Sequence, residues 1–217
     1  MSKFEQEIRP FITHEAVVLS GTLTESMATA MGQARVDSRR YPHREFPHVM
    51  PLLLRCAMRM ELENYALPPG WTVTGNSKLM GQLLLTHEER AVDLRLLKER
   101  RRTYSGGVPP AGHNQARRRA WSGDIAFPFE VEPAEPERTT ILWVWDFVGE
   151  PHDDDAGFTQ RLVHTLAPGS YGRAVPCDLS LDMLPGGGIF DRLEFAGGED
   201  STDFFHVQLD ETAEDGD

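Results

Sequence analysis

The stretch QLLLTHEERAVDLRLLK, residues 82–98, holds the pattern that decides the fold. Within it, Val92, Leu94 and Leu96 alternate with Asp93 and Arg95, so the apolar side chains share one face of an extended segment. Residues 82–86 form a second apolar run on the other side of a short polar turn. The sequence therefore predicts a β-hairpin over residues 81–98.

More extended segments follow towards the C-terminus. In TTILWVWDFV, residues 139–148, the side chains of Ile141, Trp143, Trp145 and Phe147 fall on one side of an extended chain. Further strand candidates, separated by turns that contain Gly or Pro, are residues 161–166, 174–183, 189–195 and 204–209. Regular short strands with glycine turns predict a mainly antiparallel β-meander.

The residues before the hairpin have a helical period instead. The run Thr-Leu-Thr-Glu at 22–25 has the spacing of a capping box, and apolar residues recur after it at steps of three and four. A second helix is predicted from Pro51 through Leu62, with Arg55 and Arg59 as solvated charge on its polar face. Pro-Pro-Gly at 68–70 ends it.

The predicted fold class is therefore α+β, with a helical N-terminal third, a β-hairpin and a mainly antiparallel β-meander. We expect a single domain over residues 1–209, helical in 1–68 and β-rich in 71–209, because two cores of about 70 residues would each be marginal. Residues 210–217 are predicted to be a disordered acidic tail.

The sequence predicts a cytoplasmic protein without a membrane span. Its longest apolar stretches are far shorter than the roughly 20 residues of a transmembrane helix. The N-terminus, MSKFEQEIRPF, carries acids and lacks the apolar core of a secretory signal. Cys56 and Cys177 stand in no disulfide or metal spacing, and Cys56 is expected to be a buried thiol.

No complete catalytic, cofactor or metal motif is present in the sequence. His14 and His87 each begin a His-Glu pair, but Val18 and Ala91 stand where an HExxH motif needs its second His. The glycine groups match no nucleotide-binding loop, and no GxSxG elbow occurs. We therefore expect no cofactor, no metal and no catalytic residue.

Charge is distributed unevenly along the chain. Residues 95–119 carry a net +7 within a protein of net charge −12, which leaves −19 for the rest. Residues 103–110, rich in Gly and Pro, are predicted to be a mobile loop between two arginine triplets. The candidate binding residues are Arg95, Lys98, Arg100, Arg101, Arg102, Tyr104, His113, Asn114, Arg117, Arg118, Arg119 and Trp121.

This basic segment admits several interpretations. Arginine forks grip carboxylates, so a protein partner is the leading hypothesis. Nucleic acid is an alternative, with arginines on phosphates and Tyr104 or Trp121 stacked on a base. The arginines could instead pair with the protein's own acids. An enzyme of unrecognised type, using His113 and Asn114 on a transferred phosphate, is a further alternative.

Residues 94–99 (LRLLKE), 108–119 (VPPAGHNQARRR) and the strand at 141–147 resemble a group of uncharacterised bacterial proteins. Those proteins place a charged hairpin, a short P…Q-A-R loop and a late β-meander in the same order. The resemblance spans residues 80–195. It implies an accessory or neutralising protein of a toxin–antitoxin or phage-defence locus, with a neighbouring toxin or helix-turn-helix/zinc-peptidase-like regulator as partner, and it supplies no catalytic residues.

Overall fold

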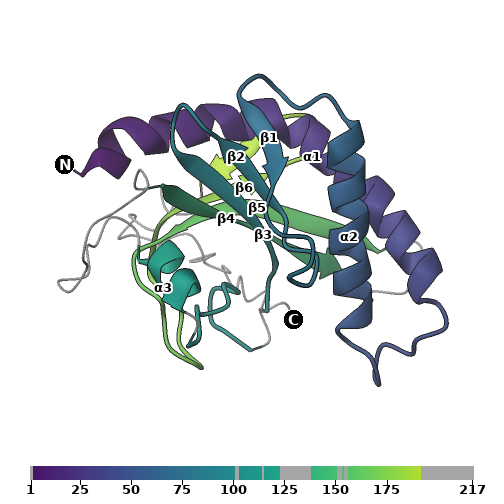
Figure 1. Ribbon diagram of the computed structural model, residues 1–217. Helices are drawn as coiled ribbons and strands as arrows, with labels where there is room; N and C mark the ends of the chain where they lie inside the picture. The colour runs from purple at the N-terminus through teal and green to yellow at the C-terminus, as the bar shows by residue number, and fades with distance from the viewer. Residues whose placement is uncertain are drawn as a thin grey trace, which may run out of the picture.

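The computed structural model describes residues 2–100, 103–113, 115–122, 138–150, 153 and 156–191. Its centre is a sheet whose seven strands lie side by side in chain order. The strands are β1 (Trp71–Thr74), β2 (Leu84–His87), β3 (Val92–Lys98), β4 (Thr139–Val148), β5 (Gly157–Thr165), β6 (Cys177–Met183) and β7 (Ile189–Asp191). In Figure 1, α1 (Arg9–Ser38) crosses the top of the view, and α2 (Val49–Asn64) lies to one side of the strands. The short helix α3 (Gln115–Trp121) lies below the strands. The α+β prediction is confirmed.

The sheet consists of two antiparallel groups joined by one parallel pair. β1 to β3 form the first group, and β4 to β7 form the second. β3 and β4 run parallel, from Val92 opposite Thr139 to Lys98 opposite Trp145. Parallel neighbours need a long crossover connection, which residues 99–138 supply. The predicted hairpin is confirmed as β2 and β3. Strand β1 was not predicted, because its four residues are too few to show an alternating pattern.

The first helix begins well before the capping pattern at 22–25. A π-helical turn, η1 (Phe4–Ile8), leads directly into α1, so Thr22 lies within the helix. The backbone amides there bond to the preceding turn, and the Thr-x-x-Glu pattern has no free amide to satisfy. Ile12 and Ala16 continue the buried stripe backwards at the same spacing. The predicted start at Thr22 is therefore wrong.

The second predicted helix is confirmed as α2, but two expectations on it are wrong. Its buried stripe consists of Met50, Leu54, Met58 and Leu62. Cys56 lies off this stripe and is exposed. Arg59 is not simply solvated charge, because it donates to backbone carbonyls around β1 at 3.0–3.3 Å, namely those of Thr74, Gly75 and Gln82.

Each face of the sheet carries an apolar cluster. The larger cluster lies between the sheet and the helices η1, α1 and α2, and it includes Trp143 of β4. The smaller cluster lies on the opposite face and joins Trp121 of α3 to Leu142, Val144 and Val163. Both faces of β4 are thus buried, since successive side chains of a strand point to opposite faces.

Some predicted features lie outside the described residues: the strand at 204–209, the end of the strand at 189–195 and the acidic tail at 210–217. Of the candidate strand at 189–195, the structure describes Ile189–Asp191 as β7. Within the described part of the chain, no helix combines the length and the hydropathy that crossing a membrane requires.

Candidate anion-binding site

Residues 103–113 are docked on the sheet. The amide of Ala111 donates to the carbonyl of Pro168 at 2.8 Å, and the indole Nε1 of Trp121 donates to the carbonyl of Pro109 at 3.0 Å. Ala111 is also part of the smaller apolar cluster. The sequence predicted a mobile loop here, and the structure shows this loop in contact with α3 and residues 166–176, with Gly and Pro at its turns.

A buried ion pair anchors the start of this loop. The side chains of Glu99 and Arg161 are only 1% and 7% exposed, and Arg161 Nε donates to the Glu99 carboxylate. The two other guanidinium nitrogens donate to Ser180 Oγ at 3.0 Å and to the carbonyl of Gly106. Charge-assisted hydrogen bonds of this kind are among the stronger ones in proteins. The pair therefore ties Glu99 and Gly106 to Arg161 of β5, which in turn bonds to Ser180 of β6.

Three segments cover the face of the sheet that carries the smaller apolar cluster. They are residues 103–113, residues 115–122, which include α3, and residues 166–176. We call them the cover layer. Tyr104 of the first segment contacts Tyr171 of the third edge to face, with ring centroids 5.7 Å apart. The cover layer contains Arg117, Arg118, Arg119 and Arg173, and no Asp or Glu. It is a purely basic part of an acidic protein.

The predicted binding residues separate by exposure. Arg101, Arg102 and Asn114 lie outside the described residues. The exposed ones are Arg100, His113, Arg118 and Arg119. Those partly buried are Arg95, Lys98 and Arg117, and those buried are Tyr104 and Trp121.

Lys98 is neutralised within the protein. Its Nζ lies 2.8 Å from Asp146 Oδ1 and over the rings of Trp145 and Phe147, at 5.5 and 5.0 Å from their centroids. For Lys98, the interpretation that the basic segment pairs with the protein's own acids holds.

The two predicted stacking rings are buried. Trp121 is 0% exposed and Tyr104 is 7% exposed, so neither presents an open face to a nucleobase in this arrangement. Tyr171 is 81% exposed and is the open aromatic ring of the cover layer. The sequence offered no signal for it, because Tyr171 lies far along the chain from the basic segment.

Arg95 and Arg117 lie against the same indole ring. Their guanidinium carbons are 5.7 and 5.8 Å from the centroid of Trp121. Arg55 of α2 lies near enough for its charge to interact with both. We call Arg55, Arg95 and Arg117 the arginine cluster. It brings together an α2 residue, a β3 residue and an α3 residue.

The electrostatics of the cluster are repulsive. The pKa of Arg95 lies below its ordinary value, mainly because burial removes hydration and further because Arg117 and Arg55 repel its charge. Burial also lowers the pKa of Arg55, while Cys56 opposes this shift and Arg117 adds to it. Within the described residues, Arg95 makes no hydrogen bond or ion pair through its side chain. Because a guanidinium stays protonated at neutral pH, Arg95 is a positive charge with no described counter-charge.

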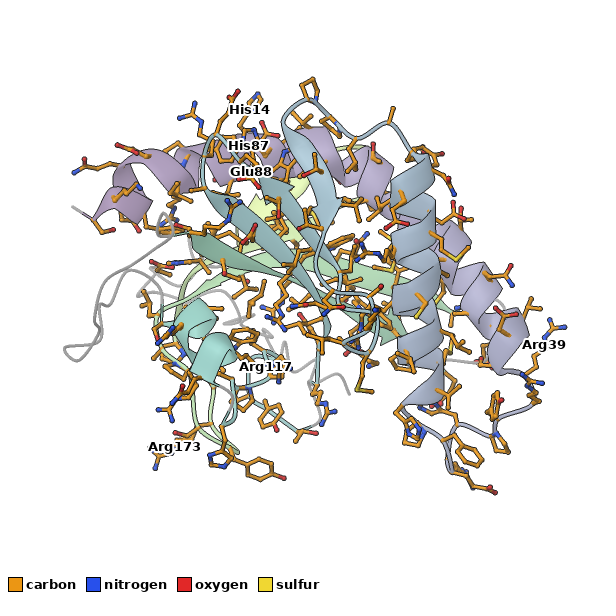
Figure 2. All side chains as sticks on the ribbon, viewed as in Figure 1. His14, Arg39, His87, Glu88, Arg117 and Arg173 are labelled. Atoms are coloured by element: carbon orange, nitrogen blue, oxygen red, sulfur yellow. The ribbon has the colours of Figure 1, made fainter. Side chains whose placement is uncertain are left out.

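Sequence reasoning missed two members of this region. Arg55 was predicted to be solvated charge, because its position in the helical pattern shows only that it lies off the apolar stripe. Arg173 lies outside the basic segment, on the last part of the cover layer. Figure 2 shows Arg117 and Arg173 in the lower part of the molecule, and Arg39 at the distant end of α1.

The chain matches no family model, no curated protein and no solved structure. Among the residues that the structure describes, no group of three or more His, Cys, Asp or Glu side chains is arranged to hold a metal ion. The chemistry of the cover layer and the arginine cluster is therefore the basis of the functional proposal.

Proposed function

We propose that this protein acts by binding, as a non-enzymatic regulatory or antitoxin-like protein whose cover layer and sheet hold an acidic surface of a partner protein. One observation carries the proposal. The cover layer has Arg117, Arg118, Arg119 and Arg173 but no acid, within a chain of net charge −12. A positive surface of this kind complements a negative one and steers the encounter with it.

The cover layer is also preorganised for binding. The ion pair between Glu99 and Arg161 and the hydrogen bond from Trp121 to Pro109 hold it before any partner arrives. Binding to a rigid surface loses less conformational entropy than binding to a flexible one. The exposed ring of Tyr171 adds a residue type that is enriched at the energetic centres of interfaces.

A nucleic-acid partner is the weaker alternative. The rings of Tyr104 and Trp121, which would stack on bases, are buried. The net charge of −12 also opposes the long-range approach of a polyanion. Exposed arginines such as Arg118 could still contact phosphates, so the experiment includes this outcome.

The resemblance drawn from the sequence supplies the kind of partner, which is a regulator or toxin encoded nearby. We place the encounter in the cytoplasm. Cys56 and Cys177 are both free thiols, and free thiols suit a reducing compartment.

The test compares two pairs of adjacent exposed arginines. The protein encoded beside this one is captured with the wild-type chain, with R118A/R119A and with R39A/R40A. Arg39 and Arg40 are exposed, and Arg39 lies far from Arg117 in Figure 2. We expect R39A/R40A to retain the partner and R118A/R119A to lose at least about 90% of it, equal to about 1.4 kcal/mol of binding free energy.

Equal capture by all three chains would refute the proposal. A parallel titration with duplex and single-stranded DNA and RNA at about 50 and 200 mM salt tests the alternative, since phosphate contacts make binding fall steeply over this range. Salt-sensitive binding that depends on Arg118 and Arg119, without capture of a protein, would favour the nucleic-acid function instead.

A further inference from the structure

Helix α2 carries a second apolar stripe besides its buried one. The buried stripe packs on α1 and the sheet, and Figure 1 shows α2 crossing in front of α1. On the opposite side of the helix, steps of three and four residues bring together Val49, Leu52, Leu53, Cys56 and Met60. We call these five residues the outer stripe. A helix that is apolar on both sides is ordinarily buried, so the outer stripe indicates that a further chain covers α2.

A neighbouring loop enlarges this apolar surface. Leu79 and Met80, between β1 and β2, are 62% and 67% exposed. The loop is held against α2, because Arg55 Nη1 donates to the carbonyl of Met80 at 3.0 Å. Gly81 packs so close to Cys56 that a Cβ at residue 81 would lie 3.0 Å from its sulfur. Contiguous exposed apolar patches of this kind mark interaction sites on soluble proteins.

The two ends of the outer stripe differ in shape. At its N-terminal end, a hollow of about 710 Å³ lies between the end of α1 and the start of α2. The side chains that line the hollow include Val36, Val49, Leu52, Leu53, Arg39 and Arg40. At the other end of the stripe, the side chain of Met60 is 63% exposed. One end of the stripe is thus concave, and the other end carries a projecting side chain.

The two ends also differ in charge. Arg39 and Arg40 line the hollow together with one acid, Asp37, so two positive charges against one negative charge leave a net +1 there. Glu63 lies in the last turn of α2. Arg59 holds one of its carboxylate oxygens at 2.7 Å, and the Glu63 side chain is still 48% exposed. Because a carboxylate accepts several hydrogen bonds, Glu63 can meet a further arginine.

We propose that the outer stripe is the interface of a homodimer, in which α2 of one copy lies antiparallel to α2 of a second copy. A two-fold interface uses the same patch on both subunits and must therefore complement itself. The antiparallel arrangement meets this condition twice, since Met60 of each copy enters the hollow of the other and Glu63 approaches Arg39 and Arg40. A parallel arrangement would bring like charges together and set the two hollows face to face.

The same arrangement fixes the register of the two helices. Cys56 stands midway between Leu52, which lines the hollow, and Met60. A two-fold axis beside Cys56 therefore places Met60 opposite Leu52 of the second copy and brings the two Cys56 thiols near one another. An interface made by one helix from each copy is small, below about 1,200 Å² in total, so we expect a dissociation constant in the micromolar range.

The dimer goes beyond the proposed function and does not depend on it. The outer stripe lies on the side of the sheet with the larger apolar cluster, whereas the cover layer lies on the opposite side. Arg39 and Arg40 contribute at the rim, where exposed ion pairs add little to affinity. R39A/R40A therefore remains the control for partner capture, and dimerisation and partner capture can fail separately.

The experiment is sedimentation velocity of the full chain from about 1 to 200 μM, a range over which we expect the wild type to change from monomer to dimer. In M60E a charge replaces the side chain that enters the hollow. Its dissociation constant should rise at least about tenfold, because burying an unpaired charge is costly.

The matched control is V18E. Val18 is an exposed apolar residue of α1, 44% exposed, and it lies about 27 Å along the helix from Val36 at the hollow. V18E should dimerise like the wild type. Because both substituted side chains are exposed, both variants should also keep the unfolding midpoint of the wild type.

Cross-linking tests the register. The chain has two cysteines, so in the C177S variant Cys56 is the remaining thiol. A bismaleimide should join two copies of C177S through Cys56 at concentrations where the dimer forms, and it should join far fewer copies of M60E/C177S. C56S/C177S provides the background.

Three results would overturn the proposal. One is a wild type that is still monomeric at about 200 μM, which would leave the outer stripe to a different protein. Another is the same dissociation constant for the wild type, M60E and V18E, which would place the contact elsewhere on the molecule. The third is a dimer that the bismaleimide does not join through Cys56, because the two helices would then not lie antiparallel about this residue.

Discussion

Replacing Glu99 by Gln should lower the free energy of unfolding by about 3–5 kcal/mol. The carboxylate of Glu99 is 1% exposed and its partner Arg161 is 7% exposed, so the substitution leaves a buried guanidinium without its counter-charge. Arg161 keeps Ser180 Oγ and the carbonyl of Gly106 as acceptors. The Gln carbonyl can accept a hydrogen bond but carries no charge, which places the expected loss at the lower end of that range.

Urea and thermal unfolding of E99Q measure this effect. For a chain of this size, each kcal/mol lowers the melting temperature by about 2–4 °C, so the midpoint should fall by about 6–20 °C. The double variant E99M/R161M removes both charges and should be less destabilised than E99Q, because no unpaired charge remains buried. Limited trypsin digestion should also cut E99Q faster near residue 100, where the ion pair anchors the loop.

The matched control is the Lys98–Asp146 pair one residue away along the chain. Its side chains are 28% and 18% exposed, so D146N should cost about 1 kcal/mol or less. The reasoning is refuted if E99Q unfolds within about 1 kcal/mol of the wild type. It is also refuted if E99M/R161M is as unstable as E99Q, because the loss would then come from packing instead of the unpaired charge.

The remaining predictions concern Trp121 and the cysteines. W121F should cost about 1–2 kcal/mol because it removes the hydrogen bond to Pro109, and W121A should cost about 3–5 kcal/mol through the cavity it opens. Y171A removes a ring that is 81% exposed. Its free energy of unfolding, measured in the same urea titrations, should lie within about 0.5 kcal/mol of the wild-type value. Burial raises the pKa of the Cys177 thiol above its ordinary value, partly opposed by Arg161. A raised pKa leaves less of the reactive thiolate, so at pH 8 iodoacetamide should alkylate the exposed Cys56 before the partly buried Cys177. Equal rates of labelling by mass spectrometry in the folded protein would contradict this.

The local parts of the fold could be predicted from the sequence. Alternation in residues 82–98 and 139–148 depends only on which face each side chain of a strand takes, so these strands were predicted correctly. The parallel pairing of β3 with β4 depends on where residues 99–138 run, and no local pattern records that path. The capping pattern at Thr22 shows the opposite failure, in which a local motif was overridden by a helix that had already begun.

The candidate site was predicted only in part. The concentration of charge identified Arg95 and Arg117, because clustered charge is visible in one dimension. Arg55 could not be found, since α2 meets the cluster only through tertiary packing. The role assigned to Trp121 also changed. Its position close to three arginines in the sequence predicted a stacking ring, whereas its burial within the cover layer makes it the ring against which Arg95 and Arg117 lie.

The parallel contact between β3 and β4 also bears on the order in which the molecule is made. Antiparallel neighbours joined by short turns can pair within microseconds, but β3 and β4 can pair only after the long connection between them has closed, and such non-local pairing is slow. The arginine triplets lie in that connection, and residues 166–176, which complete their surroundings, leave the ribosome later still. A nascent or half-folded chain therefore displays the arginines without arranging them. The partner proposed above would therefore meet the complete cover layer only on a folded protein.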